Sequence, residues 1–237
     1  SKRRRLVMVR LSAGEKKKLL IIDTCKKLFY RNGYANTTYE DICKAADIPP
    51  GTIPYHFNGK RDIAAVIDRE YERENKTYIE KLCGDRFSLT QMMVIENFHM
   101  WKRIFEDARI RRFLLDISSD RLPTASTVDA ITYFYRCVMD DRGIEGISEK
   151  ELTLIVGAQI GMSDGLIHAI KDSEYDYTYE EAAEFGIRFF LRQLSVDDKT
   201  IAQLTKEGKE IFDQLPIDNR YYEDFAYDDK FVHPMTQ

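Results

Sequence analysis

The stretch from residue 37 to residue 60 reads TTYEDICKAADIPPGTIPYHFNGK and predicts two short helices joined by a tight turn. Thr37 and Glu40 have the spacing of a capping box, so a first helix is expected over 38–46. Pro49-Pro50 suits the entry to a second helix over 50–57, because proline fixes φ at a helical value in the first turn. This pattern is typical of a helix-turn-helix, whose second helix is narrow enough to enter the major groove of DNA.

The sequence before this stretch predicts a preceding helix. Ile21, Cys25 and Phe29 recur at helical spacing within residues 16–32, and Gly33 follows where a chain leaving a helix often needs a positive φ. A mini-core for the three helices is expected from apolar residues in all of them. Its members are Phe29, Tyr34, Ile42, Ile48, Ile53 and Phe57.

Together these segments resemble the DNA-binding head of TetR-family regulators. The resemblance is ungapped, covers about residues 16–63, and is carried by IIDTCKKLFYRNGY at 21–34, TTYEDICKAADI at 37–48, and GTIPYHF at 51–57 with Lys60. It implies that Tyr39, Thr52, Tyr55 and His56 face the DNA and that Lys60 holds a phosphate. The helical spacing of Thr52, Tyr55 and His56 lets their side chains converge, although Tyr55 and His56 could instead be packing residues.

Three residues depart from the family pattern. Pro49 stands where a capping Ser or Thr is usual, Glu40 where an Arg is common, and Pro54 where a Tyr usually contacts DNA. With Pro50 as the first helical residue, Pro54 would be the fifth, and an interior proline costs about 3 kcal/mol. A kink or a 3₁₀ turn could absorb part of this cost. We therefore expect a short, irregular recognition helix and an unusual operator, with loss of DNA binding as the less favoured alternative.

Charge is divided unevenly along the chain. Residues 1–62 carry 14 Lys and Arg against 6 Asp and Glu, a net charge of +8, whereas residues 63–237 carry 22 against 34, a net charge of −12. A basic head on an acidic body is expected where only one end meets phosphates, although chance clustering on solvated faces gives the same pattern. We assign 1–62 to the DNA-binding domain and 63–237 to a second domain. The arm Lys2–Arg5 could enter a minor groove or be a solvated tail, and Met8 downstream of Ser1 leaves open whether the arm is native.

The second part of the chain shows helical apolar spacing almost throughout, with no convincing strict alternation. The predicted fold is all-α, with a three-helix helix-turn-helix head and a larger helical-bundle regulatory and dimerisation domain. After a long helix from Lys60, further helices are expected near 89–107, 109–117, 124–141, 149–172, 179–194 and 197–215. The acidic segment 216–237 is rich in aromatic residues, so part of it is expected to pack on the body.

The resemblance also implies an effector pocket among the body helices. The candidates are aromatic or polar-edged residues, each of which is also readable as ordinary core. They are Phe98, His99, Met100, Trp101, Phe105, Tyr133, Phe134, Met139, Met162 and His168. Their abundance favours a small, largely apolar effector.

Family members usually form homodimers through their last two long helices, which here would be 149–172 and 179–194. Gly157, Gly161 and Gly165 recur at intervals of four in the first of these, and Phe189 lies in the second. A glycine inside a helix costs roughly 0.8–1.0 kcal/mol relative to alanine. We therefore expect another helix to approach this face closely, either from the same subunit or, as we favour, from a second one.

Composition disfavours several other classes of protein. The four cysteines form no C-x-x-C pair and the four histidines are scattered, so neither a disulfide framework nor a metal site is expected, and a reduced cytoplasmic location follows. No signal peptide and no apolar run of membrane length is apparent, so no membrane partner is expected. The phosphate-binding and hydrolase motifs are missing, and no cofactor is expected. The leading hypothesis is a ligand-responsive repressor acting as a homodimer on double-stranded operator DNA, followed by an architectural DNA binder without an effector, with an all-helical enzyme last.

Overall fold

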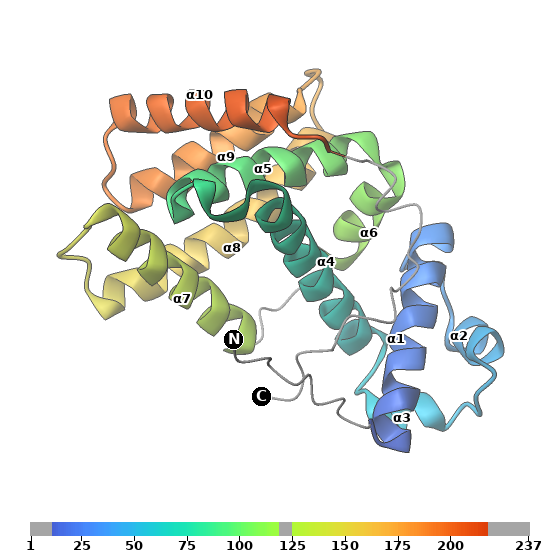
Figure 1. Ribbon diagram of the computed structural model, residues 1–237. Helices are drawn as coiled ribbons and strands as arrows, with labels where there is room; N and C mark the ends of the chain where they lie inside the picture. The colour runs from blue at the N-terminus through green and yellow to red at the C-terminus, as the bar shows by residue number, and fades with distance from the viewer. Residues whose placement is uncertain (1–10, 119–124, 218–237) are drawn as a thin grey trace, which may run out of the picture. The chain divides into compact units, whose positions relative to one another are not determined.

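The computed structural model describes residues 11–118 and 125–217, and the predicted all-α fold is confirmed. Within these two ranges the regular structure consists of helices, with no β-strand (Figure 1). The chain divides into two compact units, Ser1–Asp68 and Arg69–Gln237. The sequence had placed this division after residue 62. The basic arm Lys2–Arg5 and most of the acidic segment 216–237 lie outside the described residues.

The first unit contains α1 (Ala13–Asn32), α2 (Tyr39–Ala46), α3 (Thr52–His56) and the beginning of α4 (Lys60–Cys83). Burial of apolar side chains from all of these segments holds the unit together. The buried set includes all six predicted mini-core residues, with Ile21, Ile22, Cys25 and Ile63 added from α1 and α4. Gly33 ends α1 with φ of 92°, as the sequence predicted.

The cap of α2 differs from the prediction by one residue. Thr38, not Thr37, is the N-cap, because its hydroxyl accepts the Asp41 amide at 3.1 Å while the Asp41 carboxylate accepts the Thr38 amide at 2.8 Å. Thr37 is instead buried and donates its hydroxyl to the Gly33 carbonyl at 2.8 Å. Both arrangements satisfy groups that would otherwise lack partners at a helix end. Glu40 plays no part in the box, so the predicted Thr37–Glu40 capping box is wrong.

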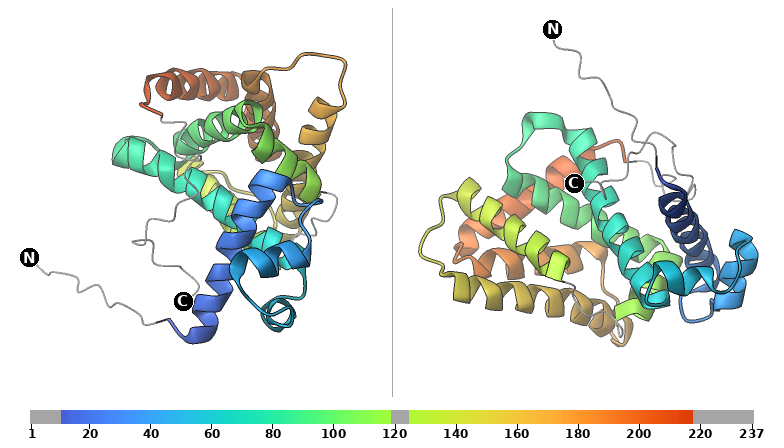
Figure 2. Two further views of the ribbon diagram at one scale, coloured as in Figure 1. Left: turned by 90° about the vertical axis from the view of Figure 1, so that its right-hand side faces the viewer. Right: turned by 90° about the horizontal axis from the view of Figure 1, so that it is seen from below.

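The second unit is built around α5 (Leu89–Glu106). The helices α9 (Tyr179–Gln193) and α10 (Asp198–Gln214) pack along it, as the views of Figures 1 and 2 show. Gly208 of α10 permits this close approach, because a Cβ there would lie 2.3 Å from Cγ1 of Val94. The remaining helices are α6 (Ala108–Ser118), α7 (Ala125–Arg142) and α8 (Glu149–Lys171), and a 3₁₀ turn, η1 (Gly84–Arg86), precedes α5.

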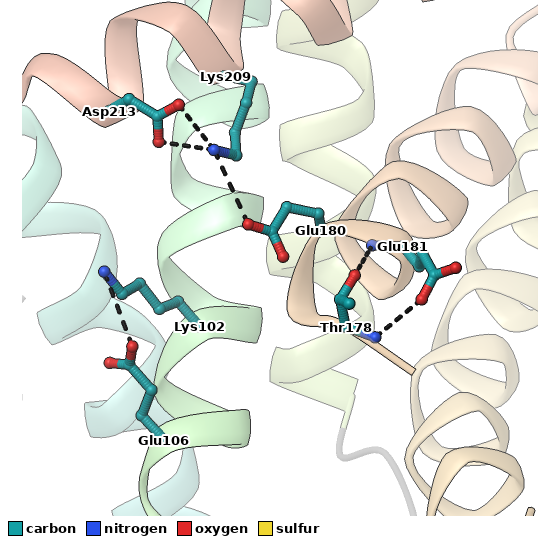
Figure 3. A network of polar contacts seen from close by, with 7 residues as sticks. All are labelled: Lys102, Glu106, Thr178, Glu180, Glu181, Lys209 and Asp213. Carbon is teal, nitrogen blue, oxygen red and sulfur yellow. Dashed lines mark hydrogen bonds and ion pairs between the residues drawn. The ribbon is translucent and has the colours of Figure 1, made fainter. Parts of the chain in front are cut away.

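A polar network covers one end of the α5, α9 and α10 packing (Figure 3). Lys209 of α10 pairs with Asp213 at 2.6 Å in its own helix and with Glu180 of α9 at 3.9 Å. Thr178 caps α9 in a box with Glu181. Exposed ion pairs of this kind contribute little to stability, so burial along α5 is the main stabilising contribution.

One helix among the described residues, α8, is long and apolar enough to cross a membrane by length and composition alone. This corrects the expectation that no segment reaches that threshold. The helix packs against α6, α7 and α9 of its own unit, while Leu154, Gly157, Gly161 and Gly165 are exposed. We therefore interpret α8 as a bundle helix with one open apolar face.

Candidate nucleic-acid interface

The predicted reading helix is short and regular. Residues Thr52–His56 form α3, with Gly51 as the N-cap and the Phe57 amide bonded to the Ile53 carbonyl at 2.9 Å. The helix starts two residues later than expected, so Pro54 is its third residue rather than its fifth. The first amides of a helix have no partner within it. Pro54 therefore removes no helical hydrogen bond, and the expected cost of an interior proline does not arise.

Three of the predicted contact residues lie on this helix with different degrees of exposure. Tyr55 is 83% exposed, whereas Thr52 and His56 are half-buried. The His56 ring lies edge-on to the Tyr55 ring, with centroids 4.9 Å apart, and close to Gly14 at the start of α1. Tyr55 is therefore not a packing residue of the head, while His56 is partly supported by α1.

Tyr39 and Lys60 form a corner where the start of α2 meets the start of α4. The Tyr39 side chain is half exposed, and its hydroxyl oxygen accepts the Lys60 backbone amide at 2.8 Å. The Lys60 ammonium donates to the carbonyls of Tyr34 at 2.6 Å and Thr37 at 2.8 Å. It also lies 4.4 Å from the centre of the Tyr34 ring. Lys60 is thus engaged with the backbone of the head, which differs from the exposed phosphate ligand that the sequence suggested.

Cys25 is fully buried in the interior of the head. Burial raises the pKa of the Cys25 thiol to about 12, and the nearby charge of Lys60 opposes this only in part. A thiol in this state stays protonated and unreactive. Across the two described ranges no cluster of three or more His, Cys, Asp or Glu residues is placed to hold a metal.

The predicted pocket residues do not form one cluster. Phe98 and Trp101 are buried on α5; Phe98 stacks on Phe212 of α10 at 6.0 Å, and Trp101 lies 6.4 Å from Phe105. Phe134 of α7 instead lies 5.8 Å from Phe190 of α9. Met139 and Met162 are half-buried on α7 and α8.

Two other pocket candidates have different surroundings. His168 of α8 contacts the Ser118 hydroxyl of α6 at 2.6 Å through Nε2. Tyr133 is 69% exposed on the outside of α7, so it does not line the interior of this unit. The buried face of α7 instead carries Tyr135, which is fully buried and was not predicted. Helical spacing from Val138 could have identified Tyr135, three residues earlier, as the inward-facing tyrosine.

The most polar part of the body interior surrounds His99. His99 is buried, and its Nδ1 lies 2.6 Å from the Asn75 amide oxygen of α4. Burial, with the charges of Arg103 and Lys102, lowers the pKa of His99 to about 3, so the ring is neutral near pH 7. Asn75 was missed by the sequence reading, since nothing in a helical run of charged residues marks one Asn as buried.

Three of the four predicted interface residues, the glycines of α8, are exposed. A Cβ at Gly157, Gly161 or Gly165 would meet nothing within 4 Å, so no helix of the described chain approaches this stripe. Phe189 of α9 is half-buried, and Leu154 and Phe185 beside these positions in sequence are 70% and 41% exposed. A neighbour within the same subunit, one of the two alternatives, is therefore excluded for the described residues.

Residues 21–67, which include α1 from Ile21, α2, α3 and the start of α4, match the family model described as "Bacterial regulatory proteins, tetR family". This part of the chain is therefore similar to the DNA-binding segment of TetR-family regulators. Among curated relatives, the HTH-type transcriptional regulator TtgR of Pseudomonas putida is 29% identical over 93 residues, which are 39% of this chain and 44% of that protein. UidR of Escherichia coli is 32% identical over 68 residues, 28% of this chain and 35% of its own. The chain thus covers less than half the length of these curated relatives.

The fold beyond the head also has solved counterparts. The structure of RolR in complex with resorcinol superposes with a TM-score of 0.57 at 12% identity, covering 82% of this chain and 94% of that one. A TetR-family regulator from Shewanella sp. PV-4 superposes with a TM-score of 0.50 at 17% identity, covering 74% and 96%. At these identities the likeness shows the fold alone, an all-helical fold shared over most of each chain.

Proposed function

We propose that the protein is a transcriptional regulator that binds operator DNA through its TetR-family head. The observation that carries the proposal is the head itself, in which α3 presents an 83% exposed Tyr55 beside Thr52 and His56. A large exposed aromatic side chain on a short helix after a tight turn is suited to contact base edges or the sugar-phosphate backbone in the major groove. In this proposal Tyr39 contacts the sugar-phosphate backbone of the DNA, while α1 supports α3.

Selection of DNA from a random duplex library with the full-length protein tests this function. We expect one sequence to be enriched, and fluorescence anisotropy at moderate salt should then show at least about a thousandfold preference for it over random duplex. Enrichment of no sequence would contradict the proposal. Affinity should fall with rising salt, since basic side chains release counterions from phosphates.

We further propose that the protein acts as a homodimer through the open face of α8 and α9. This face combines the exposed glycines 157, 161 and 165 with exposed Leu154 and Phe185. Glycines that meet nothing in their own chain allow a second helix to approach closely. A two-fold dimer also suits DNA recognition, because it presents two reading helices to two half-sites.

Sedimentation of the full chain across a concentration series tests the dimer. Leu154→Glu should shift the protein to a monomer, because it places a charge in the proposed interface. Tyr133→Glu is the matched control, since it introduces the same charge at a 69% exposed aromatic position on α7. Equal dissociation of both variants, or a monomeric parent protein, would contradict this interface.

Finally, we propose that a small, largely apolar effector binds the body and releases the protein from DNA, so that it acts as a repressor in the cytoplasm. Support comes from the aromatic side chains within the body, and the related fold of RolR has been solved with resorcinol. Because α4 begins in the head and continues into the body, a ligand that favours one body conformation can bias the head.

The chain has a single tryptophan, and Trp101 is buried. Its fluorescence therefore reports binding in a screen of small aromatic compounds, and a compound that changes it should also lower DNA affinity.

A further inference from the structure

The Lys60 side chain is directed into the head rather than away from it. Its ammonium bonds the Tyr34 and Thr37 carbonyls, and both of these residues are buried. The face of the Tyr34 ring lies 4.4 Å away and adds a cation–π contact. To reach a DNA phosphate the ammonium would have to leave two carbonyls without these bonds. The Tyr34 carbonyl would keep the Thr37 amide at 3.3 Å, but two hydrogen bonds to a charged group would be lost, which is costly.

The backbone of the same residue holds Tyr39. The Lys60 amide donates to the Tyr39 hydroxyl oxygen at 2.8 Å, while Asp62 accepts the Asn58 amide at 3.1 Å. An acidic side chain, Asp62, therefore already lies in the first turn of α4.

Glycine at position 59 makes this geometry possible. Gly59 has φ of +151°, and a Cβ on it would lie 3.2 Å from the Tyr39 hydroxyl. Since that oxygen accepts the Lys60 amide, its own hydrogen can be donated outward from the half-exposed ring. A hydroxyl that accepts one hydrogen bond is polarised as a donor to the next acceptor.

We propose that Lys60 is a positioning residue whose ammonium fixes residues 34–37 from inside the head and whose amide aims the Tyr39 hydroxyl at a DNA phosphate. The phosphate at this corner is bound by Tyr39 and not by the lysine charge. The inference rests on the proposed DNA binding, and it assigns the contact within that interface. No proton or bond is exchanged; the corner works by geometry alone.

The two assignments differ in their salt dependence. Each phosphate neutralised by a lysine contributes about 0.9 to the slope of log affinity against log salt on duplex DNA. A neutral tyrosine hydroxyl contributes affinity without releasing a counterion. Removal of the Lys60 charge should therefore leave the slope nearly unchanged if the lysine acts only through position.

The experiment compares full-length Lys60→Met, Tyr39→Phe and their combination on the duplex enriched from the random library. We expect each single variant to lower affinity by about tenfold, the size of a hydrogen bond to a charged group. The slope should stay within about 0.3 of the parent value in both. The combined variant should lose at most about twofold more than either single variant, since both changes disable one contact. Lys44→Met, which removes an exposed charge elsewhere in the head, gives the effect of charge removal alone.

Hydrogen exchange without DNA provides a second measurement. The amides of residues 34–40 should exchange faster in Lys60→Met than in the parent protein and stay unchanged in Lys44→Met and Tyr39→Phe. A slope lowered by about 0.9, or losses that multiply in the combined variant, would overturn the proposal and assign the phosphate to Lys60. Unchanged exchange at 34–40 would overturn it as well. If the library yields no enriched sequence the proposed function fails, yet the exchange measurement still decides whether Lys60 fixes this segment.

Discussion

Tyr55 is a large, 83% exposed side chain on the reading helix. We expect Tyr55→Ala to lower affinity for the selected duplex by about tenfold, because a contact with a base edge or the sugar-phosphate backbone is lost. The free energy of unfolding should change by less than about 0.5 kcal/mol, since an 83% exposed ring contributes little to packing. Anisotropy and urea unfolding measure the two quantities. Tyr133→Ala removes a 69% exposed ring from α7 and should leave DNA affinity unchanged; an equal loss there would argue against a specific role for Tyr55.

Gly208 allows α10 to pack on α5 because it has no side chain. Gly208→Ala should destabilise the body by about 1–3 kcal/mol, because the added Cβ would lie 2.3 Å from the Val94 Cγ1 atom and force α10 away from α5. Urea unfolding followed by Trp101 fluorescence measures this loss. Lys206→Ala, at an exposed position one half-turn earlier, should have almost no effect, and stability equal to the parent in both variants would contradict the packing described.

For single residues, the sequence predicts which side chains are buried in the core better than it predicts which groups a polar side chain or a proline contacts. The head's core residues were predicted because their apolar periodicity fixes the buried face of each helix. The roles of Thr37, Pro54 and Lys60 were not, because each depends on where a helix begins. A shift of one or two residues in that position exchanges a cap for a buried hydroxyl, or an interior proline for a tolerated one. Lysine is also long enough to point either way.

The helix α8 has an exposed stripe of glycines that contacts no other helix of the described chain. In the isolated chain, Gly161→Ala should stabilise the helix by roughly 0.8–1.0 kcal/mol, since a Cβ there meets open space. In the proposed dimer the same methyl group enters a close helix contact, so it should raise the dimer dissociation constant. Urea unfolding and sedimentation at low and high protein concentration separate the two effects. Stabilisation at every concentration would show that no second chain packs on this stripe.

The existence and order of helices could be predicted from periodicity, whereas the assembly of a pocket could not. Phe98 and Phe134 are both aromatic residues of predicted body helices, yet they pack on α10 and α9 respectively. Helical spacing defines a buried face but not which helix covers it. The packing of α9 and of α10 on α5 depends on Gly186 and Gly208 respectively, because side chains of α5 approach closely at both positions.

At the scale of the whole molecule, buried His99 and half-buried Glu96 give the stability pH dependences of opposite sign. The pKa of His99 is lowered to about 3 by burial and nearby cations, so between about 6.5 and 3 the unfolded state binds the extra proton, and stability is lost as pH falls. The pKa of Glu96 is raised to about 7 by burial, so between about 4.5 and 7 the folded state binds the extra proton. Its contribution is lost as pH rises.

Glu96→Gln isolates the second effect. The difference in unfolding free energy, variant minus parent, should grow with pH between about 4.5 and 7, because the amide cannot ionise. Urea unfolding at a series of pH values measures it. Glu80→Gln, at a neighbouring position that is 52% exposed, should show a much smaller change with pH, and a pH-independent difference in Glu96→Gln would contradict the assignment.

A reading helix of five residues cannot be ordered by helical propensity alone, because helix nucleation is unfavourable. Pro49 and Pro50 precede α3 and Pro54 lies within it, and each restricts φ both in the folded and in the unfolded chain. Proline at a compatible position typically stabilises by about 0.4–1 kcal/mol because the unfolded chain has fewer conformations to lose. The same restriction applies at the moment of DNA contact: a helix that is already confined gives up less conformational entropy on binding. The prolines, one of which was expected to disturb this helix, thus restrict its conformation. In the proposed complex with DNA, a rigid helix favours binding to few sequences over binding to many.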